Sequence, residues 1–322
     1  MSGPAWTLEP AHLDAALAAV RAHAVRTPLV RAPALGDDVW IKDETQQHTG
    51  SFKVRGALAR VLSLDPDQAR AGVIAASAGN HGLGVAYAAR IAGIRARVFV
   101  PRTAARVKRD GIAALGAEVV VTEAPGFDET DDLARDAAAR DGAIYVSPFD
   151  DPLVVAGNGG TTALEIFEDL PGAAVLVAPI GGGGLAIGLA AGRERARSTA
   201  RLVGVQSEAS PVMRQSLELG RAIERFTPTV ATLAEGLEGG VSKTAFQHVR
   251  RSFESVEVVS EEAIADAMRF ARQELGCIVE GSAAVAIAWA RVHARAERGP
   301  VVVLLTGRNV DLDVLDKVHQ IQ

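Results

Sequence analysis

Short apolar runs recur along the chain and alternate with longer segments in which apolar and polar positions are mixed. The runs are GVIAAS (72–77), ARVFVP (96–101), AEVVVT (117–122), AVLVAP (174–179), RLVGVQ (201–206) and VVVLLT (301–306). Such runs are typical of strands that are buried on both faces of a parallel sheet. The segments between them, for example residues 81–93 and 107–116, are alanine-rich and amphipathic, as surface helices are. This alternation predicts an α/β fold, with a parallel sheet covered by helices on both faces.

Three glycine-bearing segments follow predicted strands and open predicted helices. They are SAGNHG (77–82), GNGGTTALEI (157–166) and PIGGGGLAIGLA (179–190). In an open α/β sheet, ligands bind beyond the carboxyl ends of the strands. Backbone N–H groups at the opening of a helix favour an anion there, because the helix dipole adds to their partial positive charge. All three segments are therefore candidate ligand loops.

The four consecutive glycines from Gly181 to Gly184 are costly in chain entropy, which makes a purely structural role a weak explanation. Without side chains, they allow a phosphate to approach several N–H groups closely. A dinucleotide-binding turn is the alternative, because the spacing roughly matches G-x-G-x-x-A. That turn comes with an acid at the end of the next strand, whereas here the strand ends in Gln206 and Glu208 lies just beyond. We therefore favour a phosphate site over a nicotinamide cofactor.

Further polar groups stand near the predicted strand ends. Ser77 and Asn80 are either helix caps or parts of a clamp for a carboxylate. His81 is interpreted as a structural residue rather than a catalytic base. Thr306 ends the last predicted strand and is either an ordinary strand-terminal residue or one whose hydroxyl bonds a ring nitrogen. Glu280 is either a solvated acid at a helix start or a carboxylate of the cleft.

The composition narrows the class of protein. The chain has 322 residues, of which 48% are hydrophobic, and a formal net charge of −5. These values suit one large domain or two modest ones and do not suit a nucleic-acid binder. The single cysteine, Cys277, excludes a disulfide within the chain and a cysteine-based metal cluster. The sequence lacks signal-peptide features and a run long enough to cross a membrane, so we expect a cytoplasmic protein without a membrane partner.

Several motifs together resemble the fold-type II pyridoxal phosphate enzymes, and among them the serine/threonine dehydratase (threonine ammonia-lyase) and serine racemase group. The motifs are SFKVRGA (51–57), SAGNHG, PIGGGGL, VEGSAA (279–284) and TGRN (306–309), in the family's order. The resemblance extends over nearly the whole chain. It implies a fold like that of the tryptophan synthase β-subunit, with two open twisted sheets and helices on both faces. It also implies a large domain of residues 1–65 and 150–322 and a small domain of residues 66–149, which carries the asparagine loop. Homodimers are common in the group.

The resemblance implies a role for each candidate residue. Lys53 would hold pyridoxal 5'-phosphate as a Schiff base and, once the substrate displaces it, remove the proton from the substrate's α carbon. Asn80 would bond the phenolic oxygen and Thr306 the pyridine nitrogen, while Phe52 and Glu280 would lie beside the cofactor. The remaining candidates are the phosphate cradle of Gly181, Gly182, Gly183, Gly184 and Leu185 and the substrate-carboxylate loop of Ser77, Ala78, Gly79 and His81.

These roles imply β-elimination from a β-hydroxy amino acid such as L-threonine or L-serine, which yields a 2-oxo acid and ammonia. A neutral hydroxyl at the pyridine nitrogen favours prompt elimination over a long-lived carbanion. Racemases of the group place a second hydroxyl where this chain has Ala78, so a dehydratase is favoured over a racemase. β-Replacement ranks lower, because enzymes of that class carry a different asparagine loop. A member that binds a metabolite without turnover is disfavoured, because Lys53, Asn80 and the glycine cradle are retained.

Other positions bear on specificity and regulation. Arg308 stands where the family commonly has glycine, and it either pairs with an extra anionic group of the substrate or is a solvated loop residue. The loop AEGLEGGV (234–241) is glycine-rich and leaves room for a larger side chain. 3-Hydroxyaspartate, through Arg308, and bulkier β-hydroxy amino acids, through this loop, are therefore alternatives to threonine and serine. Gln206 replaces the acid with which some relatives bind a divalent cation, so we predict no metal site. The chain ends soon after TGRN, so we expect no C-terminal regulatory domain and no control by isoleucine through one.

Overall fold

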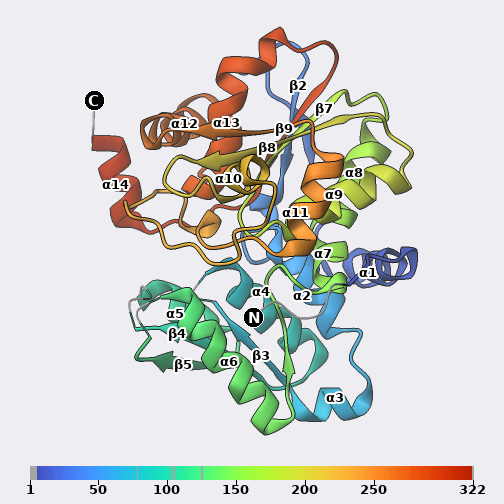
Figure 1. Ribbon diagram of the computed structural model, residues 1–322, viewed down its shortest axis with the longest axis vertical. Coiled ribbons are helices and arrows are strands. Elements are labelled where there is room, and N and C mark those ends of the chain that lie inside the picture. The colour runs from blue at the N-terminus through green and yellow to red at the C-terminus, as the bar shows by residue number, and fades with distance from the viewer. Residues whose placement is uncertain (1–5, 78, 103, 105, 125, 321–322) are drawn as a thin grey trace.

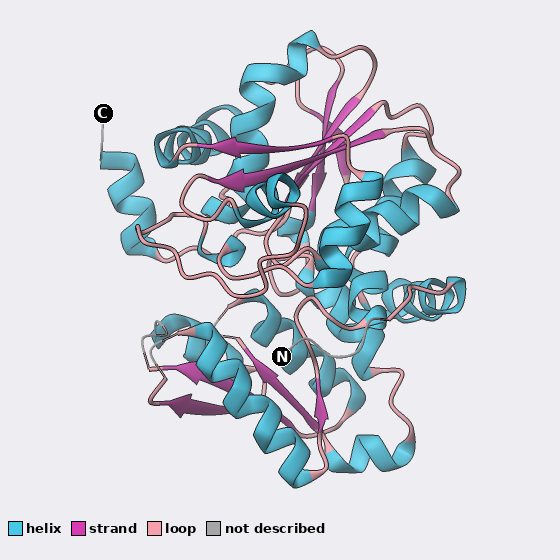
Figure 2. Ribbon diagram, in the orientation of Figure 1, coloured by secondary structure: helices cyan, strands magenta, loops and turns pink. Residues whose placement is uncertain are grey.

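The computed structural model describes residues 6–77, 79–102, 104, 106–124 and 126–320. Two separate sheets lie one above the other in the view of Figure 1, and helices flank each of them (Figure 2). This arrangement confirms the predicted α/β fold with two open sheets. Within the described ranges, no helix combines the length and the apolar character that crossing a membrane requires.

The larger sheet has six strands in the order β1-β2-β10-β7-β8-β9. Only β1 and β2 pair antiparallel, and the other neighbours are parallel. The strands are β1 (Leu29–Arg31), β2 (Val39–Asp43), β7 (Val175–Pro179), β8 (Arg201–Ser207), β9 (Ser255–Val259) and β10 (Val301–Leu305). The helices around this sheet are α7 (Pro152–Val155), α8 (Thr161–Asp169), α9 (Gly184–Arg195), α10 (Val212–Leu219), α11 (Lys243–Ser252), α12 (Glu261–Glu274), α13 (Gly281–His293) and α14 (Leu312–Gln320).

Alternate residues of β7 enter opposite cores of the larger sheet. Val175 and Val177 pack in a cluster with α12 and α13, whereas Leu176 and Ala178 pack in a cluster with α8 and α9. Successive side chains of a strand point to opposite faces. Because both faces are covered, every residue of the strand is apolar, which is the pattern that revealed it in the sequence.

The smaller sheet is all parallel, in the order β5-β4-β3-β6. Its elements are β3 (Val73–Ala76), β4 (Ala96–Pro101), β5 (Glu118–Thr122), β6 (Ile144–Tyr145), α3 (Pro66–Ala71), α4 (Asn80–Ala92), α5 (Arg106–Ala114) and α6 (Phe127–Asp141). Val73 and Ala75 pack with α4, and Ile74 and Ala76 pack with α6 on the other face. The six predicted strands correspond to β3, β4, β5, β7, β8 and β10.

Two helices near the N-terminus lie at the level between the two sheets in the view of Figure 1. They are α1 (Pro10–His23) and α2 (Lys53–Val61). Short helical turns elsewhere in the described chain are η1 (Glu44–Gln46), η2 (Ala156–Gly160), η3 (Glu235–Leu237) and η4 (Ala294–Ala296). Helix α2 buries Val54, Leu58 and Val61 in the core of the smaller sheet, although it precedes that sheet in sequence. The predicted domain limits, after residues 65 and 149, stay a prediction.

The expectation that GNGGTTALEI (157–166) is a ligand loop is wrong. Its glycines form η2, one buried turn of π-helix that continues into α8. A Cβ at Gly159 would lie 2.2 Å from the carbonyl oxygen of Leu185, and a Cβ at Gly188 would lie 2.3 Å from that of Val155. The glycines therefore allow η2 and α9 to pack with their backbones in contact, and they do not open a ligand site.

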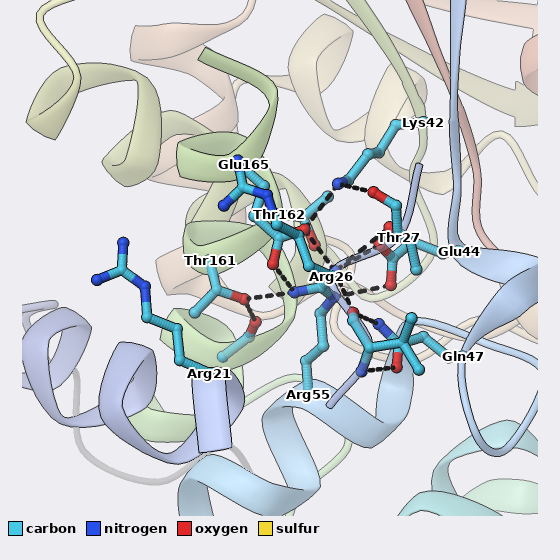
Figure 3. A network of polar contacts seen from close by, with 12 residues as sticks. Arg21, Arg26, Thr27, Lys42, Glu44, Gln47, Arg55, Thr161, Thr162 and Glu165 are labelled. Atoms are coloured by element: carbon cyan, nitrogen blue, oxygen red, sulfur yellow. Dashed lines mark hydrogen bonds and ion pairs between the residues drawn. The ribbon is translucent and has the colours of Figure 1, made fainter. Parts of the chain in front are cut away.

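Buried charged side chains tie α2 to the larger sheet (Figure 3). The guanidinium of Arg55 donates to both carboxylate oxygens of Glu44 at 2.8 Å and to those of Glu165 at 2.7 and 2.8 Å. Lys42 Nζ lies 2.6 Å from Glu165 Oε2, so two cations face two carboxylates. Burial alone would lower the pKa of Arg55, but the two carboxylates outweigh it and raise this pKa. The charged network thereby fixes the position of α2.

Candidate active site

A cavity of about 600 Å³ lies where the carboxyl ends of strands from the two sheets meet. Its walls include the ends of β3, β7 and β10 and the residues that follow them. Of the candidate residues, it is lined by Phe52, Lys53, Ser77, Gly79, Asn80, His81, Gly181, Gly182, Gly183, Gly184, Leu185, Glu280 and Thr306. Ala78 lies outside the described residues. The structure thus brings every described candidate to one site, while their individual roles stay predictions.

Lys53 is the first residue of α2, and its position is set by a short pairing with the end of β10. The N–H of Phe52 donates to the carbonyl oxygen of Thr306 at 3.0 Å. Ser51 forms an isolated antiparallel bridge with Gly307. Although Lys53 follows a turn, it is therefore attached to the carboxyl end of β10, an interior strand of the larger sheet.

The amine of Lys53 is buried in the cavity wall. Its Nζ donates to the carbonyl oxygen of Pro148 at 3.0 Å and lies 5.3 Å from the centre of the Phe52 ring. Burial lowers the pKa of Lys53 to about 8, and the nearby Glu280 carboxylate opposes this shift. A much larger share of the amine is therefore neutral near pH 8 than in a solvated lysine, and a neutral amine is both a nucleophile and a base.

The glycine segment before α9 presents unpaired backbone donors to the cavity. Within the described part of the chain, none of the N–H groups of Gly181 to Gly184 donates to another backbone group. Gly183 has φ +91°, and a Cβ there would lie 2.4 Å from that of Ala245. A Cβ at Gly182 would lie 2.8 Å from the ring of Phe149. Free donors at a helix N-terminus, with no room for side chains, suit a phosphate group.

Asn80, the first residue of α4, and Glu280, the residue before α13, meet in the cavity. Asn80 Nδ2 donates to the two carboxylate oxygens of Glu280, at 2.8 and 3.0 Å. Burial raises the pKa of Glu280 to about 7, while the hydrogen bond from Asn80 and the charges of Lys108 and Lys53 act in the opposite direction. Glu280 is therefore a buried carboxyl of the cavity and not a solvated acid at the start of α13.

His81 is neutral at ordinary pH. Its Nε2 lies 2.9 Å from the carbonyl oxygen of Val146, which only accepts, so Nε2 carries the hydrogen. Burial, together with the charge of Lys53, lowers the pKa of His81 to about 3. Because the His81 imidazole stays neutral near neutral pH, it has no charged form there that could donate a proton as a general acid.

Two hydroxyls complete the described candidates. Ser77 Oγ accepts a hydrogen bond from the N–H of Gly79 at 3.1 Å, which shapes the turn that precedes α4. Thr306 follows the last residue of β10, is 3% exposed and lines the cavity. The Thr306 hydroxyl makes no hydrogen bond with a described residue, so it is available to a bound group.

Several further residues line the cavity that were not assigned a role from the sequence, among them Lys108, Phe149 and Asn309. Lys108 in α5 reaches across to Glu235 at 3.0 Å and Asp311 at 3.8 Å. Burial alone would lower the pKa of Lys108, but its partners outweigh burial and raise it. Phe149 packs against the glycine segment, and Asn309 lines the cavity near the end of β10. Only Asn309 carried a sequence signal, because it stands in the TGRN motif.

Arg308, considered for substrate specificity, and Gln206, considered for a metal site, are not among the described residues that line the cavity. Arg308 is exposed. Gln206 is buried, and its amide donates to the carbonyl oxygen of Ile180 at 3.1 Å and accepts from the N–H of Arg214 at 3.0 Å. Across the described ranges, no cluster of three or more His, Cys, Asp or Glu side chains is arranged to hold a metal ion.

The sequence is similar to a well-defined group of enzymes. The family model described as pyridoxal-phosphate dependent enzyme matches residues 20–307. The L-threonine ammonia-lyase of Thermotoga maritima is 38% identical over 292 residues, which cover 90% of this chain and 71% of that protein. The catabolic L-threonine dehydratase of Staphylococcus aureus is 34% identical over 322 residues, which cover 95% of this chain and 92% of that protein.

Solved structures show the same similarity in three dimensions. Maize serine racemase has a TM-score of 0.89 at 28% identity, with 98% of each chain covered. Threonine deaminase isoform 2 from Solanum lycopersicum has a TM-score of 0.88 at 31% identity, with 99% of this chain and 97% of that chain covered. The predicted fold-type II architecture is confirmed by these matches.

Proposed function

Because the chain belongs to the family of pyridoxal-phosphate dependent enzymes, we propose that it is an ammonia-lyase that converts L-threonine or L-serine to a 2-oxo acid and ammonia. Relatives named for L-threonine ammonia-lyase or dehydratase activity support this substrate class. One observation of the structure carries the proposal. The buried Lys53 amine, with its lowered pKa, faces the same cavity as the unpaired N–H groups of Gly181 to Gly184.

The cavity residues fit pyridoxal phosphate. The glycine donors would hold its phosphate, the Lys53 amine would attach its aldehyde carbon, and the Thr306 hydroxyl would meet its ring nitrogen. Asn80 would donate to its phenolic oxygen. When bound, the cofactor supplies an electron sink that acidifies the hydrogen on the substrate's α carbon.

Lys53 would move both protons of the reaction. As a neutral amine it accepts the hydrogen of the α carbon, and as an ammonium it returns a proton to the departing β-hydroxyl, which leaves as water. In the cofactor-free protein the pKa of Lys53 is about 8, so both its neutral and its charged form are accessible near neutral pH, as the two tasks require. The unsaturated amine that remains is hydrolysed to the 2-oxo acid and ammonia.

The loop before α4 would bind the substrate's carboxylate. Ser77 and Gly79 precede the helix, and both line the cavity. Backbone N–H groups at a helix N-terminus favour an anion. The substrate's α carbon would then lie between this loop and the amine of Lys53.

The charges in the cavity favour an uncharged β-substituent. The lining carboxylates are Asp128, Glu129, Glu235, Glu238, Glu280 and Asp311, whereas Lys53 and Lys108 are the cations among the described lining residues. Lys108 is already paired with Glu235. A second carboxylate on the substrate would therefore be repelled, so threonine and serine are favoured over 3-hydroxyaspartate.

We also propose that the enzyme is a cytoplasmic homodimer in which a small domain of residues 66–149 closes over the substrate. The family resemblance supports the dimer. The contacts from Asn80 to Glu280 and from Lys108 to Glu235 support closure, because each joins the two proposed domains across the cavity. Light scattering coupled to gel filtration measures the assembly, and a monomer would contradict the proposal.

The proposed reaction is tested by measuring 2-oxo acid release from the cofactor-saturated protein. The substrates are L-threonine, D-threonine, L-serine, both 3-hydroxyaspartate diastereomers and phenylserine, with Lys53→Ala as the control. We expect turnover of L-threonine or L-serine that is lost in Lys53→Ala. Inversion of L-serine without 2-oxo acid release would favour a racemase, and turnover of 3-hydroxyaspartate alone would contradict the substrate assignment.

A further inference from the structure

Asn309 and Asn80 form a chain of hydrogen bonds that starts at the main chain and ends in the cavity. Asn309 Nδ2 lies 2.7 Å from the carbonyl oxygen of Thr49 and 2.6 Å from Asn80 Oδ1. Asn80 Nδ2 in turn donates to the carboxylate of Glu280. Thr49 stands in the turn that leads to Lys53, so the chain runs from that turn to the first residue of α4.

The order of these contacts determines which way each carboxamide points. A backbone carbonyl can only accept, so the carbonyl of Thr49 requires the NH₂ group of Asn309. The second N–H of that group then faces Asn80 and requires an oxygen there. Asn80 therefore turns its Oδ1 to Asn309 and its NH₂ to the cavity and Glu280. The orientation of both amides follows from one fixed acceptor on the main chain.

One N–H of Asn80 is left for a ligand. The two oxygens of a carboxylate lie close together, so Glu280 occupies one of the two N–H directions of Asn80 Nδ2. The other N–H has no acceptor among the described residues, and Asn80 lines the cavity. It can donate to an oxygen of a bound group.

Glu280 alone does not fix this orientation. Its pKa is about 7, so near neutral pH a large share of the group is protonated and carries an O–H donor. A protonated carboxyl can face either the oxygen or the nitrogen of an amide. The donor that holds Asn80 in one orientation at every working pH is the amide of Asn309.

We infer that Asn309 is a positioning residue, which fixes the carboxamide of Asn80 so that an N–H group, and not an oxygen, faces the cofactor. The inference rests on the proposal that Asn80 meets the phenolic oxygen of pyridoxal phosphate. Asn309 itself is held by the turn before Lys53, where a Cβ at Gly50 would lie 2.6 Å from Asn309 Oδ1. The lysine and the asparagine loop are thus aligned through one side chain.

The substitution Asn309→Asp tests this inference, because it replaces the NH₂ group by an oxygen of nearly the same size. The new carboxylate cannot donate to Asn80. We therefore expect Asn80 to turn its NH₂ group to that carboxylate and its oxygen to the cofactor. The dissociation constant of pyridoxal phosphate is measured by titration without any amino acid. We expect it to rise about ten- to hundredfold, the range for losing a hydrogen bond to a charged group. Arg308→Ala, an exposed neighbour, is the control and should bind the cofactor as the native protein does.

A double-mutant cycle separates positioning from a general loss of structure. If Asn309 acts through Asn80, then Asn309→Asp should change cofactor affinity less than threefold when Asn80 is already Ala. The inference would be overturned if Asn309→Asp lowered cofactor affinity as much in the Asn80→Ala background as in the native protein. It would also be overturned if Asn309→Asp bound the cofactor with native affinity. Asn309→Ala, which adds no charge, repeats the cycle if the aspartate variant does not fold. This readout is cofactor affinity and requires no turnover. If the native protein bound the cofactor but released no 2-oxo acid, the proposed reaction would be refuted and this test of Asn309 would still be valid.

Discussion

The backbone N–H of Phe52 donates a hydrogen bond to the carbonyl oxygen of Thr306 at 3.0 Å. This contact joins two motifs from opposite ends of the sequence and places the start of α2 beside the end of β10. Lys53 and the Thr306 hydroxyl consequently line the same cavity. The position of the lysine is set by the carboxyl end of the interior strand β10 and by the buried hydrogen bonds of Arg55, which hold α2.

The lowered pKa of Lys53 predicts how the cofactor-free protein takes up pyridoxal phosphate. Only a neutral amine attacks an aldehyde, so the uptake rate should rise with pH and level off above a midpoint near pH 8. Glu280→Gln should move the midpoint lower, because the Glu280 carboxylate raises the pKa of Lys53. Rates from rapid mixing at each pH are compared with those of a lysine model peptide. A midpoint near 10.4, the usual lysine value, would contradict the prediction.

The raised pKa of Glu280 predicts that the difference in stability between the native protein and Glu280→Gln depends on pH. The folded protein holds the Glu280 proton more tightly than the unfolded chain, so this stabilisation is present at low pH and is lost as the pH rises through about 7. Glu280→Gln removes the titration. Its free energy of unfolding, relative to the native protein, should therefore increase by about 3 kcal/mol between pH 4.5 and pH 8.5. Urea unfolding of both cofactor-free proteins measures this difference, and a value independent of pH would count against the buried carboxyl.

The buried network predicts a large effect of Arg55→Met. The substitution leaves Glu44 and Glu165 buried with only Lys42 to balance them, and breaking such a pair costs about 3–5 kcal/mol. Arg21→Met is the matched control, because its pair with Glu168 is on the surface, where such pairs contribute about 0–1 kcal/mol. Urea unfolding at pH 7.5 compares the three proteins. If the two substitutions lowered the free energy of unfolding equally, the buried network would contribute no more to stability than a surface ion pair.

The glycine segment predicts that Gly183→Ala disrupts phosphate binding. A methyl group there meets the Cβ of Ala245, and the residue has φ +91°, which disfavours other amino acids. We expect at least a tenfold loss of pyridoxal phosphate affinity. Gly172→Ala is the control, because a Cβ there meets no atom within 4 Å. Native affinity in Gly183→Ala would exclude the segment as the phosphate site.

The sequence predicted the parts of the fold that apolar patterning determines. Strands such as β7 and β10 are buried on both faces and therefore appear as unbroken apolar runs. Strand β2 (VWIKD) was missed, because Lys42 and Asp43 are buried and charged. Their burial depends on partners such as Glu165 that lie far away in sequence, which a local pattern does not reveal.

The sequence predicted the site residues that lie in the family motifs. It did not predict the features of the site that depend on tertiary contacts. The glycines of residues 157–160 resemble a ligand loop in sequence, yet the structure uses them for helix packing against Gly188. Lys108 lies in an ordinary amphipathic helix, and only its pairing with Glu235 across the cavity marks it. The buried state of Glu280, which the sequence left open, follows from its contact with Asn80.

Lys53 is the residue on which the proposed elimination depends. The most direct measurement is the ratio of 2-oxobutanoate to ammonia released from L-threonine by the cofactor-saturated enzyme, followed over time beside Lys53→Ala. We predict equal amounts of the two products at every time point and none from the variant. Unequal amounts, conversion of L-threonine without 2-oxobutanoate, or undiminished release by Lys53→Ala would contradict the claim.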